Sequence, residues 1–169
     1  IGLLTKGKDI INITNYLDYD VVTIGNHEFD YKIEQLKSLS NMIDARYICA
    51  NFLYRKNRTT IFDPYKIVQV GDISIGFIGV ITPQTLTKSY LHTLVDEDGN
   101  LIYDFLTENE GRDLYSTIQG YIDELRDKHN VTYVIILSHM GYGGDALPQY
   151  TSPALLANIR RVDAIIDGH

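Results

Sequence analysis

The stretch Val21–Tyr31 constrains the fold of this chain more than any other. It begins as an apolar run rich in β-branched residues, Val21–Ile24, which predicts a buried strand. Gly25 ends the strand, and a helical pattern resumes at about Lys32. Four polar residues lie between them: Asn26, His27, Glu28 and Asp30. The polar cluster is therefore predicted to lie in a loop at the C-terminal end of a strand, where open α/β sheets keep their sites.

The side chains of this loop suit a metal-assisted reaction. Asn26 offers a neutral carbonyl oxygen to a cation, and His27 can be a ligand or a general acid. Asp30 can hydrogen-bond the other ring nitrogen of His27 and favour its protonated form. A purely structural interpretation also fits, in which Asn26 and Asp30 cap the helix that follows.

Apolar periodicity predicts the remaining elements. Helical spacing is found over residues 7–18, 32–43, 108–128 and 153–160. In the first of these, Ile10, Ile13 and Leu17 are expected to form the buried face. Buried strands are expected at residues 47–50, 65–70, 73–81, 131–137 and 162–166, with a hairpin turn at residues 71–72. Gly76 and Gly79 predict the close approach of another element to the strand 73–81.

Two segments are expected to lack regular structure. Residues 53–64 are interpreted as a basic, solvated loop, and residues 82–106 as an irregular region that includes His92 as a surface histidine. Residues 96–100 resemble a calcium loop superficially, but no EF-hand pattern follows, so we expect an acidic turn.

Two later strands also end in a histidine. His139 follows the strand 131–137, and His169 follows the strand 162–166. Together with Asn26, these residues place a metal-type ligand after three different strands. The pattern predicts that the three side chains meet at one edge of a sheet and bind a cation.

Composition narrows the possible functions. With 169 residues and 44% hydrophobic residues, the chain is predicted to form one domain over residues 1–169. The net charge of −7 argues against a nucleic-acid polymer as partner, although bound cations would reverse the local sign for small phosphate esters. Cys49 is the single cysteine and is interpreted as a buried, inert thiol. No apolar run is long enough for a membrane span.

Several segments resemble one enzyme family. The string G-N-H-E-F-D at residues 25–30 resembles the Gly-Asn-His-(Asp/Glu) block of the calcineurin-like metallophosphatases, and with Tyr31 it is most similar to their 5′-nucleotidase branch. Residues 137–141 resemble the histidine block of the family, and residues 163–169 resemble its Gly-His-x-His block. Residues 47–52 also resemble the 5′-nucleotidase branch.

This resemblance implies a fold, a site and a reaction. The fold class is α/β (α+β), a two-sheet β-sandwich with helices on both outer faces. Asn26, His139 and His169 would bind one ion of a two-metal centre of Mn, Zn, Mg or Co, while His27 and Asp30 would form a general-acid pair. A hydroxide activated by the metal ions would attack phosphorus.

The resemblance also implies a substrate and a setting. The substrate would be a nucleotide, with 2′,3′-cyclic nucleotides or nucleotide sugars as alternatives. A C-terminal domain of the same polypeptide would select the substrate, and the location would be extracytoplasmic.

The chain departs from the family pattern at both ends. In the family, an Asp-x-His block on an early strand is followed by a Gly-Asp block, and neither block is found before Asn26. The Gly-His-x-His block is cut after His169. We therefore expect an internal piece of a longer enzyme, truncated at both ends, that holds at most one cation tightly and hydrolyses phosphate esters weakly or not at all. A degenerate, non-catalytic binding module is the alternative from another class.

Overall fold

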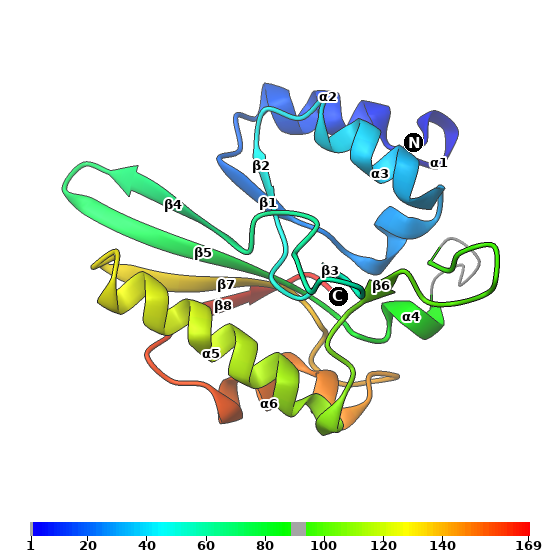
Figure 1. The fold of residues 1–169 in the computed structure, drawn as a ribbon. Coiled ribbons are helices and arrows are strands. Elements are labelled where there is room, and N and C mark those ends of the chain that lie inside the picture. Colours follow the sequence, from blue (N-terminus) through cyan, green and yellow to red (C-terminus); the bar gives the residue numbers. More distant parts are fainter. Residues whose placement is uncertain (1, 89–93) are drawn as a thin grey trace.

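The computed structural model describes residues 2–88 and 94–169, and a four-stranded sheet forms its centre (Figure 1). The strand order is β4-β5-β7-β8. The strands are β4 (Tyr65–Val70), β5 (Ile73–Ile81), β7 (Tyr133–His139) and β8 (Ala164–Asp167). The hairpin β4–β5 is antiparallel, whereas β5, β7 and β8 are parallel, so the carboxyl ends of these three strands lie at the same edge.

A second, smaller sheet packs against the first. It consists of β1 (Val21–Thr23) and β2 (Arg46–Ile48), which are parallel. Gly79 of β5 lies where this sheet approaches closest, because a Cβ atom there would lie 2.3 Å from the Ile48 carbonyl oxygen. The predicted close approach at Gly79 is thus explained by sheet-to-sheet contact, and that at Gly76 by Leu125, whose Cδ1 would lie 2.8 Å from an added Cβ.

Helices cover both outer faces, as the resemblance implied (Figure 1). On the side of the β1–β2 sheet lie α1 (Gly2–Thr5), α2 (Lys8–Tyr16) and α3 (Lys32–Ser40). On the outer side of the larger sheet lie α5 (Arg112–Asp127) and α6 (Ser152–Asn158). None of the described helices is both long and apolar enough to cross a membrane.

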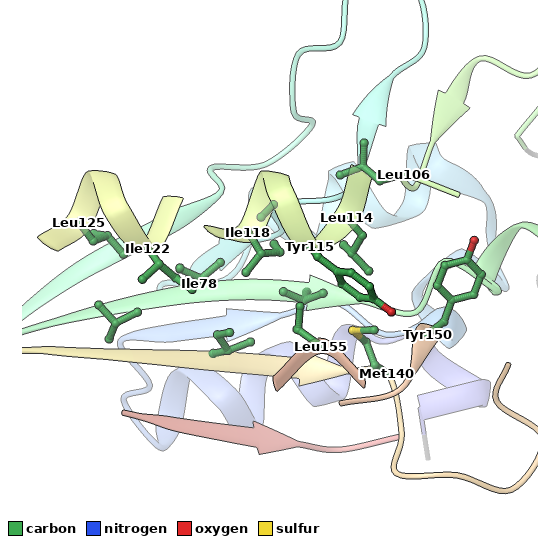
Figure 2. Packing of buried hydrophobic residues seen from close by; sticks show 14 of the residues in the cluster. Ile78, Leu106, Leu114, Tyr115, Ile118, Ile122, Leu125, Met140, Tyr150 and Leu155 are labelled. Carbon is green, nitrogen blue, oxygen red and sulfur yellow. The ribbon is translucent and has the colours of Figure 1, made fainter. Parts of the chain in front are cut away.

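The hydrophobic core has two parts. One lies between the larger sheet and α5, where Leu114, Ile118, Ile122 and Leu125 form the predicted apolar face and pack near Ile78 (Figure 2). The other is aromatic and surrounds the loop after β1. It contains Phe29, Phe52 and Phe105, and the rings of Phe29 and Phe52 are 5.2 Å apart between centroids. Phe29 thereby anchors the loop that carries the predicted site.

The two segments predicted to be irregular contain short elements. A small antiparallel pair joins β3 (Leu53–Tyr54) to β6 (Tyr103–Asp104), and α4 (Thr85–Lys88) also falls in the second segment. Arg58, expected in a solvated loop, pairs with the buried Asp104. The acidic turn is as predicted, because the Asp96 carboxylate accepts the backbone N–H groups of Asp98 and Asn100 at 3.0 and 2.8 Å. His92 lies outside the described residues.

One helix begins later than predicted because residues with positive φ angles precede it. The helix expected from residue 108 begins as α5 at Arg112, because Glu110 and Gly111 have φ angles of +56° and +88°. A short 3-10 turn, η3 (Asn109–Gly111), precedes it. In α2 the expected buried face is wrong: Ile11 is 3% exposed, whereas Ile10, Ile13 and Leu17 are about half exposed.

Candidate metal centre

Three strand exits converge at the carboxyl edge of the sheets. After β1 the chain enters a 3-10 turn, η1 (Asn26–Phe29), while β7 ends at His139 and β8 ends at Asp167, two residues before His169. The parallel register pairs Ser138 with Asp167, so the ends of β7 and β8 lie side by side. The three side chains predicted to share a site therefore come from the two different sheets.

The side chains of Asn26 and His169 both contact the same ring nitrogen of His139. The Oδ1 atom of Asn26 lies 3.1 Å from Nε2 of His139, and Nδ1 of His169 also lies 3.1 Å from that Nε2. The two imidazole rings have a centroid separation of 4.7 Å. Asn26 is 7% exposed, whereas His169 is exposed to solvent. One side of the cluster is thus buried and the other is open.

This donor set fits a divalent cation. Two ring nitrogens and one amide oxygen form a combination that suits a borderline ion such as Zn²⁺ or Mn²⁺. Ligand atoms bound at about 2.1 Å in tetrahedral geometry lie about 3.4 Å from one another, close to the separations seen here. Among the described residues no group of three His, Cys, Asp or Glu side chains is placed to hold a metal. The candidate set consists of two histidines and the amide of Asn26, whose oxygen contacts His139.

Two glycines leave room for the histidine rings. A Cβ atom on Gly25 would lie 2.7 Å from Nε2 of His139, and one on Gly141 would lie 3.0 Å from Cδ2 of His169. Gly141 also has a φ angle of +83°, which L side chains rarely adopt. Both positions require glycine for the rings to meet.

His27 and Asp30 form a pair beside this cluster. The Nδ1 atom of His27 lies 2.9 Å from Oδ2 of Asp30, and the His27 side chain is 80% exposed. Burial lowers the pKa of His139, and the neighbouring His169 lowers it further. A cavity of about 410 Å³ between α2, α3 and η1 borders His27 and Asp30.

Two carboxylates support the site: Glu28, a member of the predicted polar loop to which no role was assigned, and Asp167, which sequence reasoning did not single out. The backbone N–H of Gly25 donates to Oε2 of Glu28 at 2.6 Å, and burial raises the pKa of Glu28 despite this bond. Burial acts to raise the pKa of Asp167 as well, but hydrogen bonds, led by that from Ser152, outweigh it and lower the pKa. Glu28 lies three residues after the N-cap Gly25, the spacing of the acidic half of a capping box, but glycine cannot supply the other half and the sequence signal is weak. The partners of Asp167 are dispersed in the sequence.

Comparison of the sequence with known proteins finds phosphoesterases and nucleotidases. The family model described as calcineurin-like phosphoesterase matches residues 5–169. A 5′-nucleotidase from Bos taurus is 28% identical over 169 residues, covering 97% of this chain and 26% of that protein. A 2′,3′-cyclic-nucleotide 2′-phosphodiesterase/3′-nucleotidase from Salmonella typhimurium is 28% identical over 166 residues, covering 92% of this chain and 24% of that protein.

A solved structure also matches. The 5′-nucleotidase precursor from Thermus thermophilus superposes with a TM-score of 0.75 at 27% identity, covering 99% of this chain and 29% of that one. The chain thus spans about a quarter of the length of the curated relatives it matches, 26% in the bovine case.

Proposed function

Because the chain belongs to the calcineurin-like phosphoesterase family, we propose that it forms the metal-binding part of a hydrolase that acts on nucleotides. The family uses divalent metals, and the observation that carries the proposal is the 3.1 Å contact of Asn26 and His169 with His139, beside the His27–Asp30 pair. A degenerate, non-catalytic binding module would not need both a set of metal-type donors that converge and a His–Asp pair beside it. This favours catalysis over the non-catalytic alternative.

The proposed roles follow from donor chemistry. Asn26, His139 and His169 would hold one ion, which when bound supplies Lewis-acid polarisation of phosphoryl oxygens and acidifies water. We propose that the active protein uses two such ions, of which this donor set accounts for one. The nitrogen-rich set favours Zn, Mn or Co over Mg.

His27 is proposed as the general acid. If Nδ1–H donates to Oδ2 of Asp30 at 2.9 Å, the carboxylate fixes the orientation of the imidazole ring. The Nε2 atom is then left to deliver a proton to the leaving ester oxygen, which would otherwise depart as an alkoxide. The exposure of His27 fits this role, because the side chain must reach a bound substrate.

The substrate class and setting are also proposals. A nucleoside monophosphate is our first candidate, supported by the bovine relative, and a 2′,3′-cyclic nucleotide is the second, supported by the Salmonella relative. Nucleotide sugars are a further alternative. We propose that selection among them belongs to a C-terminal domain of the same polypeptide and that the protein works outside the cytoplasm.

One experiment tests the proposal directly. Bound Mn²⁺ and Zn²⁺ are counted per chain, and release of inorganic phosphate is then followed with nucleoside monophosphates, cyclic nucleotides, nucleotide sugars and a phosphopeptide. We expect bound metal, and fastest turnover on a nucleotide in the active protein. Fastest turnover on the phosphopeptide, or the absence of any bound cation, would contradict the proposed function. The 169-residue chain alone is expected to hydrolyse p-nitrophenyl phosphate poorly.

A further inference from the structure

The carboxylate of Asp167 ties together three segments around the two histidines. Its Oδ2 atom accepts the backbone N–H of Gly141 at 3.0 Å and the hydroxyl of Ser138 at 3.2 Å. The hydroxyl of Ser152, in the first turn of α6, also donates to this oxygen. The Oδ1 atom accepts the backbone N–H of His169 at 2.9 Å. Both oxygens are therefore engaged by the protein itself.

These partners lie on either side of the proposed ligands. Ser138 directly precedes His139 and Gly141 follows it by two residues, so the bonds to Oδ2 hold the backbone before and after that ring. The bond to Oδ1 holds the backbone of His169 itself. One side chain is thus bonded to both segments that carry the two histidines.

Two partners of the Asp167 carboxylate are buried in the protein interior. The hydroxyls of Ser138 and Ser152 are 2.8 Å apart, and these residues are only 3% and 5% exposed. The backbone of Ser152 also donates to the carbonyl oxygen of Gly141 at 2.8 Å. Buried hydroxyls cannot exchange these partners for water without cost, so α6 fixes the carboxylate in place.

We propose that Asp167 is a positioning residue that sets the spacing of His139 and His169 for cation binding, an inference that rests on the proposed function of the site. His169 lies two residues after the end of β8, and the bond from its backbone N–H to Oδ1 of Asp167 holds it beside His139. A ligand that is ordered before binding loses less conformational entropy when the ion arrives. Holding its backbone N–H therefore strengthens metal binding without contact between Asp167 and the ion.

The variant Asp167→Asn tests this geometry selectively. An amide has one oxygen, and that oxygen is expected at the Oδ2 position, where three donors converge. The amide nitrogen then faces the backbone N–H of His169, and only that bond is lost. The matched control is Asp163→Asn, because the Asp163 carboxylate accepts the N–H of Val134 at 2.7 Å and pairs with Arg126 near the opposite end of β7 and β8.

Two readouts separate positioning from general stability. The first is the nuclear Overhauser effect between the rings of His139 and His169 in metal-free protein, which a 4.7 Å centroid separation predicts to be strong. The second is the dissociation constant for Mn²⁺ and for Zn²⁺, measured by competition with a chelating dye. We expect Asp167→Asn to lose the ring contact and to bind about 10- to 100-fold more weakly, as outer partners of metal ligands typically do. Asp163→Asn should keep both properties.

Each contrary result has a distinct meaning. Weaker binding with an unchanged ring contact would show that Asp167 acts through its charge or as a ligand and not through position. Equal losses in both variants would show a general stability effect, and either result overturns the inference. If the unmodified chain binds no cation, the proposed function fails, and the ring contact still decides the role of Asp167. Should Asp167→Asn not fold, Ser152→Ala removes one donor to the same carboxylate, and an unchanged ring contact and affinity there would overturn the inference.

Discussion

His27 and Asp30 lie three residues apart in the loop after β1, and their Nδ1 and Oδ2 atoms are 2.9 Å apart. The ring of His27 is 80% exposed, whereas the Asp30 side chain is 31% exposed, so the carboxylate is the fixed partner and the ring the accessible one. Asn26, the next residue in the chain before His27, turns the other way and contacts His139. Adjacent residues of one turn therefore contact two different partners, in keeping with the two different roles proposed for them.

His27→Ala should separate these tasks. Without the ring the leaving oxygen loses its proton donor, and turnover in the active protein should fall by about 10²- to 10⁴-fold. The metal content should stay the same, because His27 is not among the three convergent donors. His129→Ala is the matched control, since His129 follows α5 and contacts Tyr65 instead. Loss of metal in His27→Ala, with activity restored by excess metal, would identify His27 as a ligand instead.

Cys49 should be chemically inert in the folded protein. It is fully buried, and burial raises the pKa of its thiol to about 12. The thiolate is the reactive form, so neither access nor ionisation favours reaction at pH 8. We expect an aromatic disulfide reagent to modify Cys49 only as urea unfolds the chain, with the modification curve following the loss of tertiary structure. Rapid modification in the absence of urea would mean that the aromatic core around Cys49 opens readily.

At the scale of elements, the spacing of apolar residues was sufficient to predict those helices and strands whose apolar side chains are buried in the core. Helical spacing over residues 108–128 predicted α5, and the nearly continuous apolar run over residues 73–81 predicted β5. The strands predicted at residues 131–137 and 162–166 correspond to the parallel strands β7 and β8, so His139 and His169 lie at one edge of the larger sheet, as expected. That part of the site was predictable from the sequence alone. Asn26 was expected at the same edge but follows a strand of the smaller sheet.

Other elements depend on partners that are distant in sequence. The strands β3 and β6 have two residues each, and the register pairs Leu53 with Asp104 and Tyr54 with Tyr103. No local sequence pattern predicts strands this short. The start of α5 depends on the positive φ angle of Glu110, a residue type that gives no sign of it. The role of Asp167 depends on Ser138 and Ser152, which come from separate elements. Such features follow from the tertiary packing, not from propensity.

Gly79 provides a test of the contact between the sheets. Its N–H donates to Pro64 and its carbonyl accepts from Ala50 at 2.8 Å, so this backbone cannot move to make room for a methyl group. Gly79→Ala should therefore lower the free energy of unfolding by about 3 kcal/mol, at the upper end of overpacking costs. Gly76→Ala is the control and should cost less, because the atom it meets is the end of the flexible Leu125 side chain. Urea unfolding measures both, and equal costs would contradict this account.

At the scale of the whole molecule, the candidate metal centre lies at the junction of two layers. Asn26 belongs to the segment that follows β1 of the small sheet, whereas His139 and His169 follow strands of the larger sheet. The layers otherwise meet mainly through apolar and backbone packing, such as that of Gly79 against Ile48. An ion held by all three residues would cross-link the layers with bonds that neither layer can make alone.

This arrangement predicts that a divalent cation stabilises the entire fold and that one ion suffices. A ligand at 100 times its dissociation constant adds about 2.7 kcal/mol to the folded state. For a chain of this size, each kcal/mol raises the melting temperature by about 2–4 °C, so Mn²⁺ or Zn²⁺ should raise it by about 5–11 °C. Asn26→Ala should abolish most of this increase even though both histidines remain, since the ion would then contact one layer only. Calorimetry with and without metal measures the shift, titration gives the stoichiometry, and His129→Ala serves as the control that should behave like the unmodified chain. Two tightly bound ions per chain, or a full thermal shift in Asn26→Ala, would mean that other ligands within the chain hold the metal and that the layers are not linked through Asn26.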